Sequence, residues 1–258
     1  MTPAAGHQRL DELVALSLEL GDPARDLAIL AEGNTSARID HESFWVKASG
    51  TSLADAEHPD DYVAVRIEPL LETLRSGQEL GEAAVKQRLR DAAADRGGDR
   101  PPSIETFVHA ACLDVAGATF VAHTHPTTMN SLLCSDRARE AYTGVVFPDE
   151  AVMCGPRPLI VEYAAPALEL GRAVFDGLHA FAARHGEPPR VVLLLSHGLF
   201  ALGGSGSEAA AITAMAVKAA RVRAGALAAG KLRFLPDGEA ESLCGREDEQ
   251  ARRQRLAR

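Results

Sequence analysis

The sequence predicts an α/β fold in which helices cover a sheet. Short apolar runs of strand length alternate with longer segments of helical periodicity along the 258 residues, and this mixture is typical of layered α/β proteins. The two most apolar runs, Ala118–His125 and Val191–Ser196, are expected to be strands, and each closes at or beside a histidine. No internal repeat or evident boundary interrupts the pattern. We therefore expect one domain over residues 1–258, with its core at about 10–230.

The first third of the chain combines two helices with two strands. Leucines at helical spacing predict an amphipathic helix from Leu10 to Leu20, and Pro23 is suited to the first turn of a second helix over Pro23–Ala31. Small polar residues predict turns at Gly33–Ser36 and Ser49–Thr51. The strands, predicted from apolar and alternating residues, are Phe44–Ala48 and Tyr62–Ile67.

The rest of the chain is richer in helices. Alanine and charged residues predict an exposed helix over Gly81–Asp95, which Gly97–Gly98 and Pro101–Pro102 separate from the next. Ser103 is expected to N-cap that next helix, which runs through Ala111. Further helices are expected near Leu168–His185 and over Glu208–Gly230. The charged tail, residues 245–258, is expected to be solvated or partly disordered.

Composition argues against several classes of function. The net charge of −9 disfavours nucleic acid or an anionic membrane as a partner. No stretch reaches the roughly 20 apolar residues of a transmembrane helix, and the first ten residues lack the apolar segment of a signal peptide. The four cysteines are scattered, without a Cys-x-x-Cys pair, which indicates reduced thiols. We therefore expect a soluble, cytoplasmic protein.

Three histidines carry the strongest functional signal. His123 and His125 close one predicted strand and, at positions i and i+2, face the same side, about 6.6 Å apart along the backbone. His197 follows the other apolar run. Three imidazoles with an open fourth position are typical of catalytic zinc sites, although iron, cobalt or manganese could substitute. The pattern predicts a metalloenzyme.

Glu105 is the second candidate, because it opens a predicted helix. A carboxylate there stabilises the helix through the dipole and the free N–H groups. Near a metal, the same carboxylate could serve as a general base or as a displaceable fourth ligand. His109, four residues on, could orient Glu105 or simply pack.

Two predicted turns could hold an anionic group. Gly33–Ser36 and Ser49–Thr51 offer hydroxyl groups, an amide and backbone donors, and Lys47 could add a positive charge. Neither turn contains a nucleotide-binding glycine motif, and an ordinary turn is the alternative interpretation of each.

Taken together, five short motifs resemble a known family. In chain order they are Gly33–Ser36, Lys47–Gly50, Pro102–Glu105, His123–Pro126 and His197–Gly198. Their order and spacing are similar to those of the class II aldolase/adducin family, which includes fuculose-phosphate and rhamnulose-phosphate aldolases and ribulose-phosphate 4-epimerase. The resemblance covers roughly Leu10–Gly230. It implies a three-layer α/β/α fold with a central, largely antiparallel sheet, and a homotetramer with active sites between subunits.

The resemblance also implies roles for individual residues. It makes His123, His125 and His197 ligands of one Zn²⁺ per subunit, with other divalent transition metals possible, and it makes Glu105 the acid/base. Four residues would hold the substrate phosphate, namely Asn34, Ser49, Gly50 and Ser103. Family aldolases use a tyrosine of the adjacent subunit to protonate the aldehyde oxygen. Tyr142 lies at a similar distance after the His-x-His pair, but no motif anchors it, and a half-buried structural tyrosine is the alternative.

The activity that the resemblance implies is a zinc-dependent lyase. It would cleave a small ketose, which is expected to be a ketose 1-phosphate. The products would be dihydroxyacetone phosphate and an aldehyde, formed through a metal-bound enediolate. Ile104 is a departure, because many members have a second phosphate-binding serine there. A 4-epimerase, decarboxylase or dehydratase would use the same metal site. A non-catalytic adducin-like interaction module is a further alternative, but that branch has lost the metal histidines.

Overall fold

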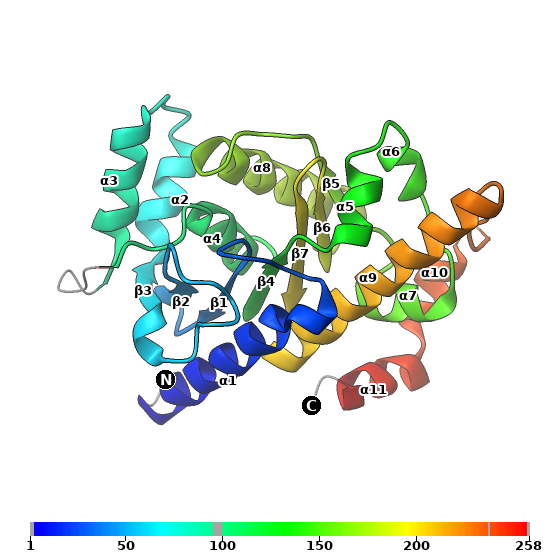
Figure 1. The fold of residues 1–258 in the computed structure, drawn as a ribbon, viewed down its shortest axis with the longest axis horizontal. Helices are drawn as coiled ribbons and strands as arrows, with labels where there is room; N and C mark the ends of the chain where they lie inside the picture. Colours follow the sequence, from blue (N-terminus) through cyan, green and yellow to red (C-terminus); the bar gives the residue numbers. More distant parts are fainter. Residues whose placement is uncertain (1–2, 95–99, 237, 257–258) are drawn as a thin grey trace.

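The computed structural model describes residues 3–94, 100–236 and 238–256 and contains one seven-stranded sheet (Figure 1). The strand order is β3-β2-β1-β4-β7-β6-β5, and every neighbouring pair is antiparallel except β5 and β6. The strands are β1 (Asn34–Arg38), β2 (Ser43–Lys47), β3 (Tyr62–Arg66), β4 (Phe120–Thr124), β5 (Leu159–Val161), β6 (Val191–Leu194) and β7 (Gly198–Gly203). The expected central, largely antiparallel sheet is confirmed.

Helices cover both faces of the sheet. One face packs against α2 (Ile67–Arg75), α3 (Glu82–Ala92), α4 (Thr106–Asp114) and α8 (Leu168–His185). The other packs against α1 (Pro3–Gly21), α5 (Thr127–Leu133) and α9 (Gly206–Ala229), and Figure 1 shows α1 and α9 crossing it side by side. Beyond them lie α6 (Ala138–Ala141), α7 (Pro148–Cys154), α10 (Glu239–Gly245) and α11 (Glu247–Leu256). The arrangement is the three-layer α/β/α fold.

Side-chain alternation explains why the sheet is central. In β4, Val121 belongs to the core on the α4 side, whereas Phe120 and Ala122 belong to the core on the α1 side. Val192 and Leu193 of β6 divide between the two cores in the same way. Strands that are apolar at every position therefore bury both faces, as a sheet between two helical layers requires. No helix in the described part of the chain has the length and apolar character needed to span a membrane.

Most predicted elements are present, although three expectations were wrong. The segment Pro23–Ala31 forms only a 3-10 turn, η1 (Pro23–Arg25), because Asp26 and Leu30 adopt left-handed backbone angles that end any helix. The predicted turn Gly33–Ser36 contributes all but Gly33 to β1. Ser103 does not cap α4, which begins at Thr106 with Glu105 as its N-cap residue.

The charged tail, expected to be solvated or partly disordered, is a helix whose described side chains are mostly exposed to solvent. Residues Glu247–Leu256 form α11, and α10 before it buries Ala240 and Leu243 against α7. Arginine, glutamate and glutamine are good helix formers, so low apolar content alone did not exclude a helix. Four expectations lie partly or wholly outside the described residues: the end of the helix predicted to Asp95, the break at Gly97–Gly98, residues 257–258 of the tail, and the single domain over 1–258.

A buried ion pair between Arg223 and Glu150 connects α9 to the segment that runs from the end of α6 to α7. Arg223 is 1% exposed; its guanidinium donates hydrogen bonds to the carbonyls of Ala141 and Gly144 at 2.7 and 2.8 Å, and lies 2.6 Å from Oε1 of Glu150. Glu150 in turn accepts from the backbone N–H of Val146 at 2.9 Å. One guanidinium thus contacts three oxygen atoms of this segment, two by hydrogen bonds and one by an ion pair.

Arg223→Met is expected to lower the free energy of unfolding by about 3–5 kcal/mol, because it leaves the buried carboxylate of Glu150 uncompensated. Urea unfolding of both proteins measures the difference. The double variant Arg223→Met/Glu150→Gln is the control, since it removes the stranded charge and should recover part of the loss. Equal stability of wild type and Arg223→Met would contradict this account.

Candidate metal centre

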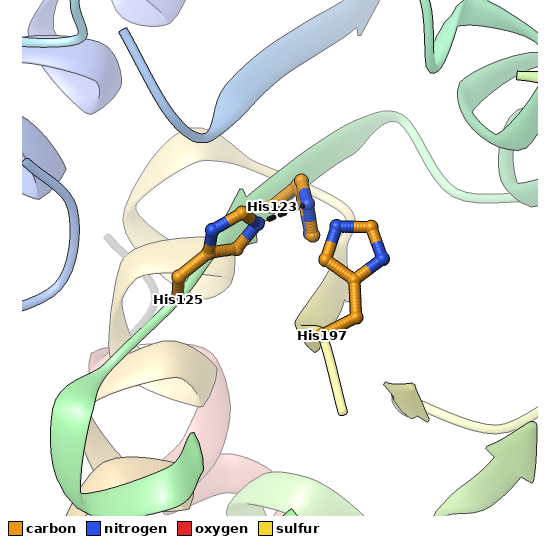
Figure 2. Close-up of side chains that lie close together, drawn as sticks. All are labelled: His123, His125 and His197. Carbon is orange, nitrogen blue, oxygen red and sulfur yellow. Dashed lines mark hydrogen bonds between the residues drawn. The ribbon is translucent and has the colours of Figure 1, made fainter. Parts of the chain in front are cut away.

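Strand β4 brings the first two histidines to one point. His123 is the fourth residue of β4 and is fully buried, and His125 follows the end of the strand. Their Nε2 atoms lie 2.9 Å apart and their ring centroids 4.6 Å apart. The i, i+2 spacing therefore places the two imidazoles together, as the sequence predicted (Figure 2).

His197 comes from the tight turn between β6 and β7. Its ring centroid lies 5.0 Å from that of His123 and 4.9 Å from that of His125. Ser196 has a left-handed φ of 57°, which is uncommon for a residue with a side chain. Gly198 is needed for packing, because a Cβ there would lie 2.5 Å from the carbonyl oxygen of Thr124 and 2.7 Å from Cδ2 of His125.

The donor atoms of the three histidines fit a metal ion. They lie within 4.8 Å of one another. Nδ1 of His123 is 2.9 Å from the carbonyl oxygen of Leu199, and Nδ1 of His125 is 3.0 Å from a carboxylate oxygen of Glu32. Both oxygens can only accept, so each Nδ1 carries the proton and each Nε2 presents a lone pair. Two such lone pairs facing each other at 2.9 Å repel unless a cation lies between them.

Glu105 completes the centre from the opposite side. Its Oε2 lies 3.2 Å from Nε2 of His123 and its Oε1 lies 3.2 Å from Nε2 of His197. Burial by itself raises the pKa of the Glu105 carboxyl, but positive charge on the rings of His123 and His197 outweighs it and holds that pKa well below its usual range. A cation bound by the neutral rings lowers the pKa in the same direction. The carboxylate is therefore ionised and directed at the point where the imidazoles meet.

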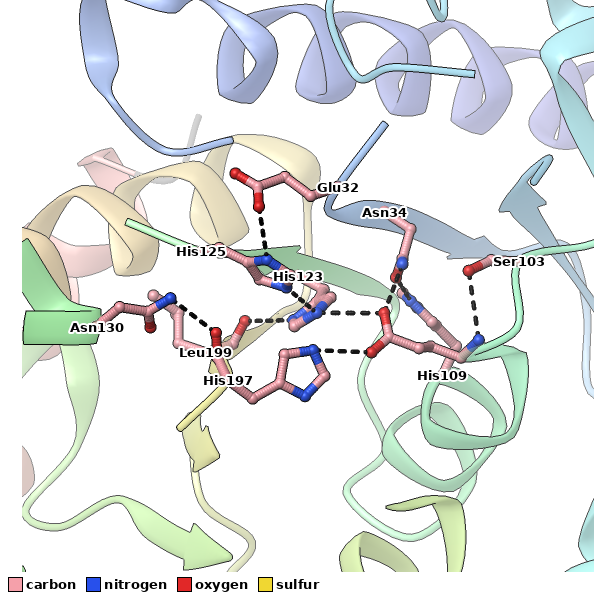
Figure 3. A network of polar contacts seen from close by, with 10 residues as sticks. Glu32, Asn34, Ser103, His109, His123, His125, Asn130, His197 and Leu199 are labelled. Atoms are coloured by element: carbon pink, nitrogen blue, oxygen red, sulfur yellow. Dashed lines mark hydrogen bonds and ion pairs between the residues drawn. The ribbon is translucent and has the colours of Figure 1, made fainter. Parts of the chain in front are cut away.

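A buried chain of hydrogen bonds supports Glu105, and Figure 3 shows its members Asn34 and His109. Nδ2 of Asn34 donates to Oε2 of Glu105 at 2.7 Å, Oδ1 of Asn34 meets Nε2 of His109, and Nδ1 of His109 lies 2.6 Å from the Ser36 hydroxyl. Burial lowers the pKa of His109 to about 3, so the ring is neutral at physiological pH. It then donates from Nε2 to the amide oxygen and accepts at Nδ1 from Ser36. His109 orients Glu105, as one of the two sequence interpretations held, but it does so through Asn34.

The four residues expected to bind phosphate lie on neighbouring segments. Backbone hydrogen bonds join the turn of Ser49 and Gly50 to the segment before Glu105. The N–H of Ser49 donates to the carbonyl oxygen of Pro101 at 2.9 Å, and the N–H of Ser103 donates to the carbonyl oxygen of Lys47 at 3.3 Å. The Ser103 hydroxyl accepts from Glu105 N–H at 3.3 Å and so keeps its own proton for another acceptor. Asn34 holds Glu105, and Ile104 is 43% exposed beside it.

Lys47 does not reach an anion in this structure. Its ammonium group is buried and donates hydrogen bonds to the carbonyl oxygens of Ala48, at 3.2 Å, and of Thr51. Burial lowers its pKa from 10.5 to about 8, against the opposing charges of Asp61 and Glu105. The buried charge therefore costs stability at neutral pH.

Lys47→Met isolates this cost. Below pH 8 the lysine is charged in both the folded and the unfolded protein, so wild type bears the full free-energy cost of burying the charge. Between pH 8 and 10.5 only the unfolded state keeps the proton, so the stability of wild type relative to Lys47→Met is expected to rise by on the order of 3 kcal/mol. Urea unfolding at pH 7.5, 9 and 10.5 tests this, and a difference that stays constant with pH would refute it.

Tyr142 is not brought to the histidines. Its side chain is 6% exposed, and the Arg223 guanidinium lies over its ring at 4.7 Å. Its hydroxyl is buried without a hydrogen-bond partner among the described residues, and burial raises its pKa. Its role at a neighbouring subunit's site stays a prediction.

Two residues of the centre were missed from the sequence. Glu32 contacts His125, and Asn130 of α5 donates to the carbonyl oxygen of His197 at 2.8 Å. Asn130 could have been suspected, because it lies five residues after His125 in a polar helix start. Glu32 precedes the Gly33–Ser36 motif, but the incorrect helix over Pro23–Ala31 hid the loop that carries it.

Comparison with known proteins agrees with the geometry. The sequence model described as the class II aldolase and adducin N-terminal domain matches residues 11–224. A structure of L-fuculose 1-phosphate aldolase superposes with a TM-score of 0.70 and 22% identity, covering 92% of this chain and 94% of that one. The N-terminal class II aldolase domain of a conserved Thermoplasma acidophilum protein superposes with a TM-score of 0.64 and 22% identity, covering 83% of this chain and 92% of that one.

A third structure is YgbL of Klebsiella pneumoniae, described only as a candidate aldolase, epimerase or decarboxylase. It gives a TM-score of 0.66 and 18% identity, covering 92% of this chain and 98% of that one. At these identities the structures show the fold. A search of curated proteins found no match. Since the family model spans most of the chain, including all three histidines and Glu105, the chain belongs to the class II aldolase and adducin family.

Proposed function

We propose that this protein is a metal-dependent carbon–carbon lyase that cleaves a small ketose 1-phosphate to dihydroxyacetone phosphate and an aldehyde. The observation that carries the proposal is the position of Glu105, whose two carboxylate oxygens lie 3.2 Å from the Nε2 atoms of His123 and His197. An ionised carboxylate beside a cation site is suited to moving a proton at a carbon next to a polarised carbonyl group.

The residues of the centre have separate proposed roles in metal binding and proton transfer. His123, His125 and His197 would hold the metal, for which we propose zinc, and the bound ion would supply Lewis-acid stabilisation of the negative charge that develops on substrate oxygens. Cleavage releases one proton from the hydroxyl that becomes the aldehyde and needs one at the carbon of the dihydroxyacetone phosphate fragment. Glu105, once protonated, delivers the proton to that carbon, and its carboxylate removes it in the reverse direction. Asn34 and His109 keep its carboxylate aimed at that carbon.

We further propose that the substrate phosphate lies against Asn34, Ser49, Gly50 and Ser103. The hydroxyl proton of Ser103 and the second amide N–H of Asn34 are available to it, because each group has one committed contact to Glu105. Gly50, with a φ of 85°, has open space where a side chain would be. A phosphate oxygen could therefore approach the backbone closely there.

The test uses the donor half of the reaction alone. Zinc-loaded protein is incubated with dihydroxyacetone phosphate in deuterated water, and NMR follows the loss of its methylene proton signals. Stereospecific exchange that disappears in Glu105→Gln is the expected result, and aldehydes can then be screened. No exchange by protein shown to contain zinc would overturn the proposed donor.

Other reactions of the same centre are the second candidate. The description of YgbL leaves the choice among aldolase, epimerase and decarboxylase open, and a dehydratase would need the same metal site. Analysis of the products formed from candidate sugar phosphates separates these reactions. The adducin-like interaction module is disfavoured, because the histidines and Glu105 keep a complete donor set.

Tyr142 is the proposed group that exchanges a proton with the aldehyde oxygen, provided that its buried hydroxyl becomes accessible. It would donate the proton in condensation and, as the phenolate, take it from the substrate hydroxyl in cleavage. In that role, Tyr142→Phe slows cleavage but leaves deuterium exchange into dihydroxyacetone phosphate unchanged, because exchange does not involve the aldehyde. Comparing both rates in wild type and variant measures this. Unchanged cleavage would remove Tyr142 from the site and leave it as a core residue.

We propose a homotetramer with active sites between subunits, in the cytoplasm. Three exposed apolar side chains flank the centre, since Ile29 and Leu30 belong to the loop that contacts His125 and Ile104 adjoins Glu105. A protein partner would cover them. Light scattering coupled to gel filtration measures the assembly, and a monomer at micromolar concentration would contradict it. The four free cysteines are consistent with a reducing compartment.

A further inference from the structure

One carboxylate outside the expected site contacts a metal-binding histidine. Oε2 of Glu32 lies 3.0 Å from Nδ1 of His125, on the side of the ring that faces away from the other two histidines (Figure 3). The side chains of His125 and Glu32 are 19% and 31% exposed. The contact is therefore partly sheltered from water, where a charge-assisted hydrogen bond keeps more of its strength.

The loop before β1 is built to hold Glu32 in place. The other carboxylate oxygen, Oε1, accepts the backbone N–H of Ile29 at 2.7 Å, and the N–H of Glu32 donates to the carbonyl of Ile29 at 3.2 Å. The carbonyl of Leu27 accepts the backbone N–H of His125 at 2.8 Å. Both oxygens of Glu32 are thus engaged by N–H donors, and the loop is tied to the same histidine twice.

The three histidines are not supported in the same way. Nδ1 of His123 donates to a neutral backbone carbonyl, that of Leu199, whereas Nδ1 of His125 donates to a carboxylate. A carboxylate behind an imidazole fixes the tautomer, holds the ring orientation and makes the opposite nitrogen a stronger ligand. Loss of such a partner typically lowers metal affinity 10–100-fold.

We infer that Glu32 is a positioning residue that holds His125 in the tautomer with the proton on Nδ1 and thereby sets the affinity of the centre for its metal. The inference rests on the proposed metal-dependent function. It assigns Glu32 no contact with substrate and no step of the reaction.

Glu32→Gln is a strict test, because an amide has one oxygen for the two N–H donors that the carboxylate satisfies. Either Ile29 or His125 loses its acceptor, or His125 moves its proton to Nε2 and no longer presents a lone pair to the metal. We expect Co²⁺ and Zn²⁺ affinity, measured by competition with a chelator, to fall about 10–100-fold. The visible spectrum of the Co²⁺ form should change as well, since it reports ligand geometry.

The matched control is Asp26→Asn. It removes one negative charge from the same loop. The Asp26 carboxylate accepts a hydrogen bond from the Thr127 hydroxyl at 2.8 Å. Asp26 has a left-handed backbone conformation, which asparagine tolerates. Its metal affinity should equal that of wild type. Equal weakening in both variants would show a general charge effect and overturn the role of the Glu32 hydrogen bond.

A second measurement needs no metal. The ¹⁵N NMR shifts of the imidazole nitrogens in the metal-free protein report which nitrogen carries the proton, and one histidine should change between wild type and Glu32→Gln. Unchanged affinity and unchanged shifts, in a wild type that binds Co²⁺, would overturn the inference alone. A wild type that binds neither metal would overturn the proposed function and the inference with it.

Discussion

Glu105→Gln is expected to lower turnover by about 10²–10⁴-fold, the range for loss of a positioned acid or base, while metal content stays at the wild-type level. The amide has nearly the same shape and keeps a hydrogen bond to Asn34, but it neither takes nor releases a proton at neutral pH. All three imidazole ligands remain, so the binding of the metal should persist.

The measurement pairs steady-state kinetics with zinc analysis of the same preparation. Glu82→Gln is the matched control, because Glu82 lies on the exposed face of α3 and, among the described residues, pairs with Lys86 alone, at 2.5 Å. Its turnover and its zinc content should both equal wild type. Full turnover in Glu105→Gln would exclude Glu105 as the acid/base, and loss of zinc would indicate a ligand role instead.

His123→Ala is expected to lose both the metal and the activity. His123 is central, because its Nε2 lies 2.9 Å from that of His125 and 3.2 Å from Glu105. Its ring also stacks on Phe200 with centroids 4.0 Å apart, which leaves it one orientation. Two imidazoles hold zinc poorly, and without Lewis-acid stabilisation worth several kcal/mol we expect turnover to fall on the order of 10³-fold or more.

Zinc content after dialysis and the stabilisation of the protein by added zinc measure this loss. Zinc that binds only the folded state raises the melting temperature of wild type, and this increase should vanish in His123→Ala. His179→Ala, at an exposed position of α8, is the control for replacing a histidine as such. A zinc-free His123→Ala protein with wild-type activity would refute a metal-dependent reaction.

Short-range patterns predicted the clustering of the three histidines well, because its geometry is local. The i, i+2 spacing of His123 and His125 fixes their common face within one strand. The position of His197 follows once β7 pairs with β4, which sets Leu199 opposite Thr124. Five motifs in one order then added the family and its layered fold.

What could not be predicted depends on backbone angles and on contacts between distant segments. Nothing in the sequence marks Leu30 as left-handed, since leucine rarely adopts that conformation, and this angle helps to form the loop that brings Glu32 to His125. The same holds for Arg223, whose partners lie 79 and 82 residues away along the chain. Tertiary packing alone creates such pairs.

The hydrogen-bond chain that runs from Ser36 through His109 and Asn34 to Glu105 limits where a proton can be transferred. Each donor in it points toward the carboxylate, from the Ser36 hydroxyl through His109 to the amide of Asn34. A carboxamide does not pass a proton from its oxygen to its nitrogen at neutral pH, so Asn34 blocks conduction into the core. A proton accepted by Glu105 therefore has no exit along this chain and must leave on the histidine side of the carboxylate, to the substrate or to the water that replaces it.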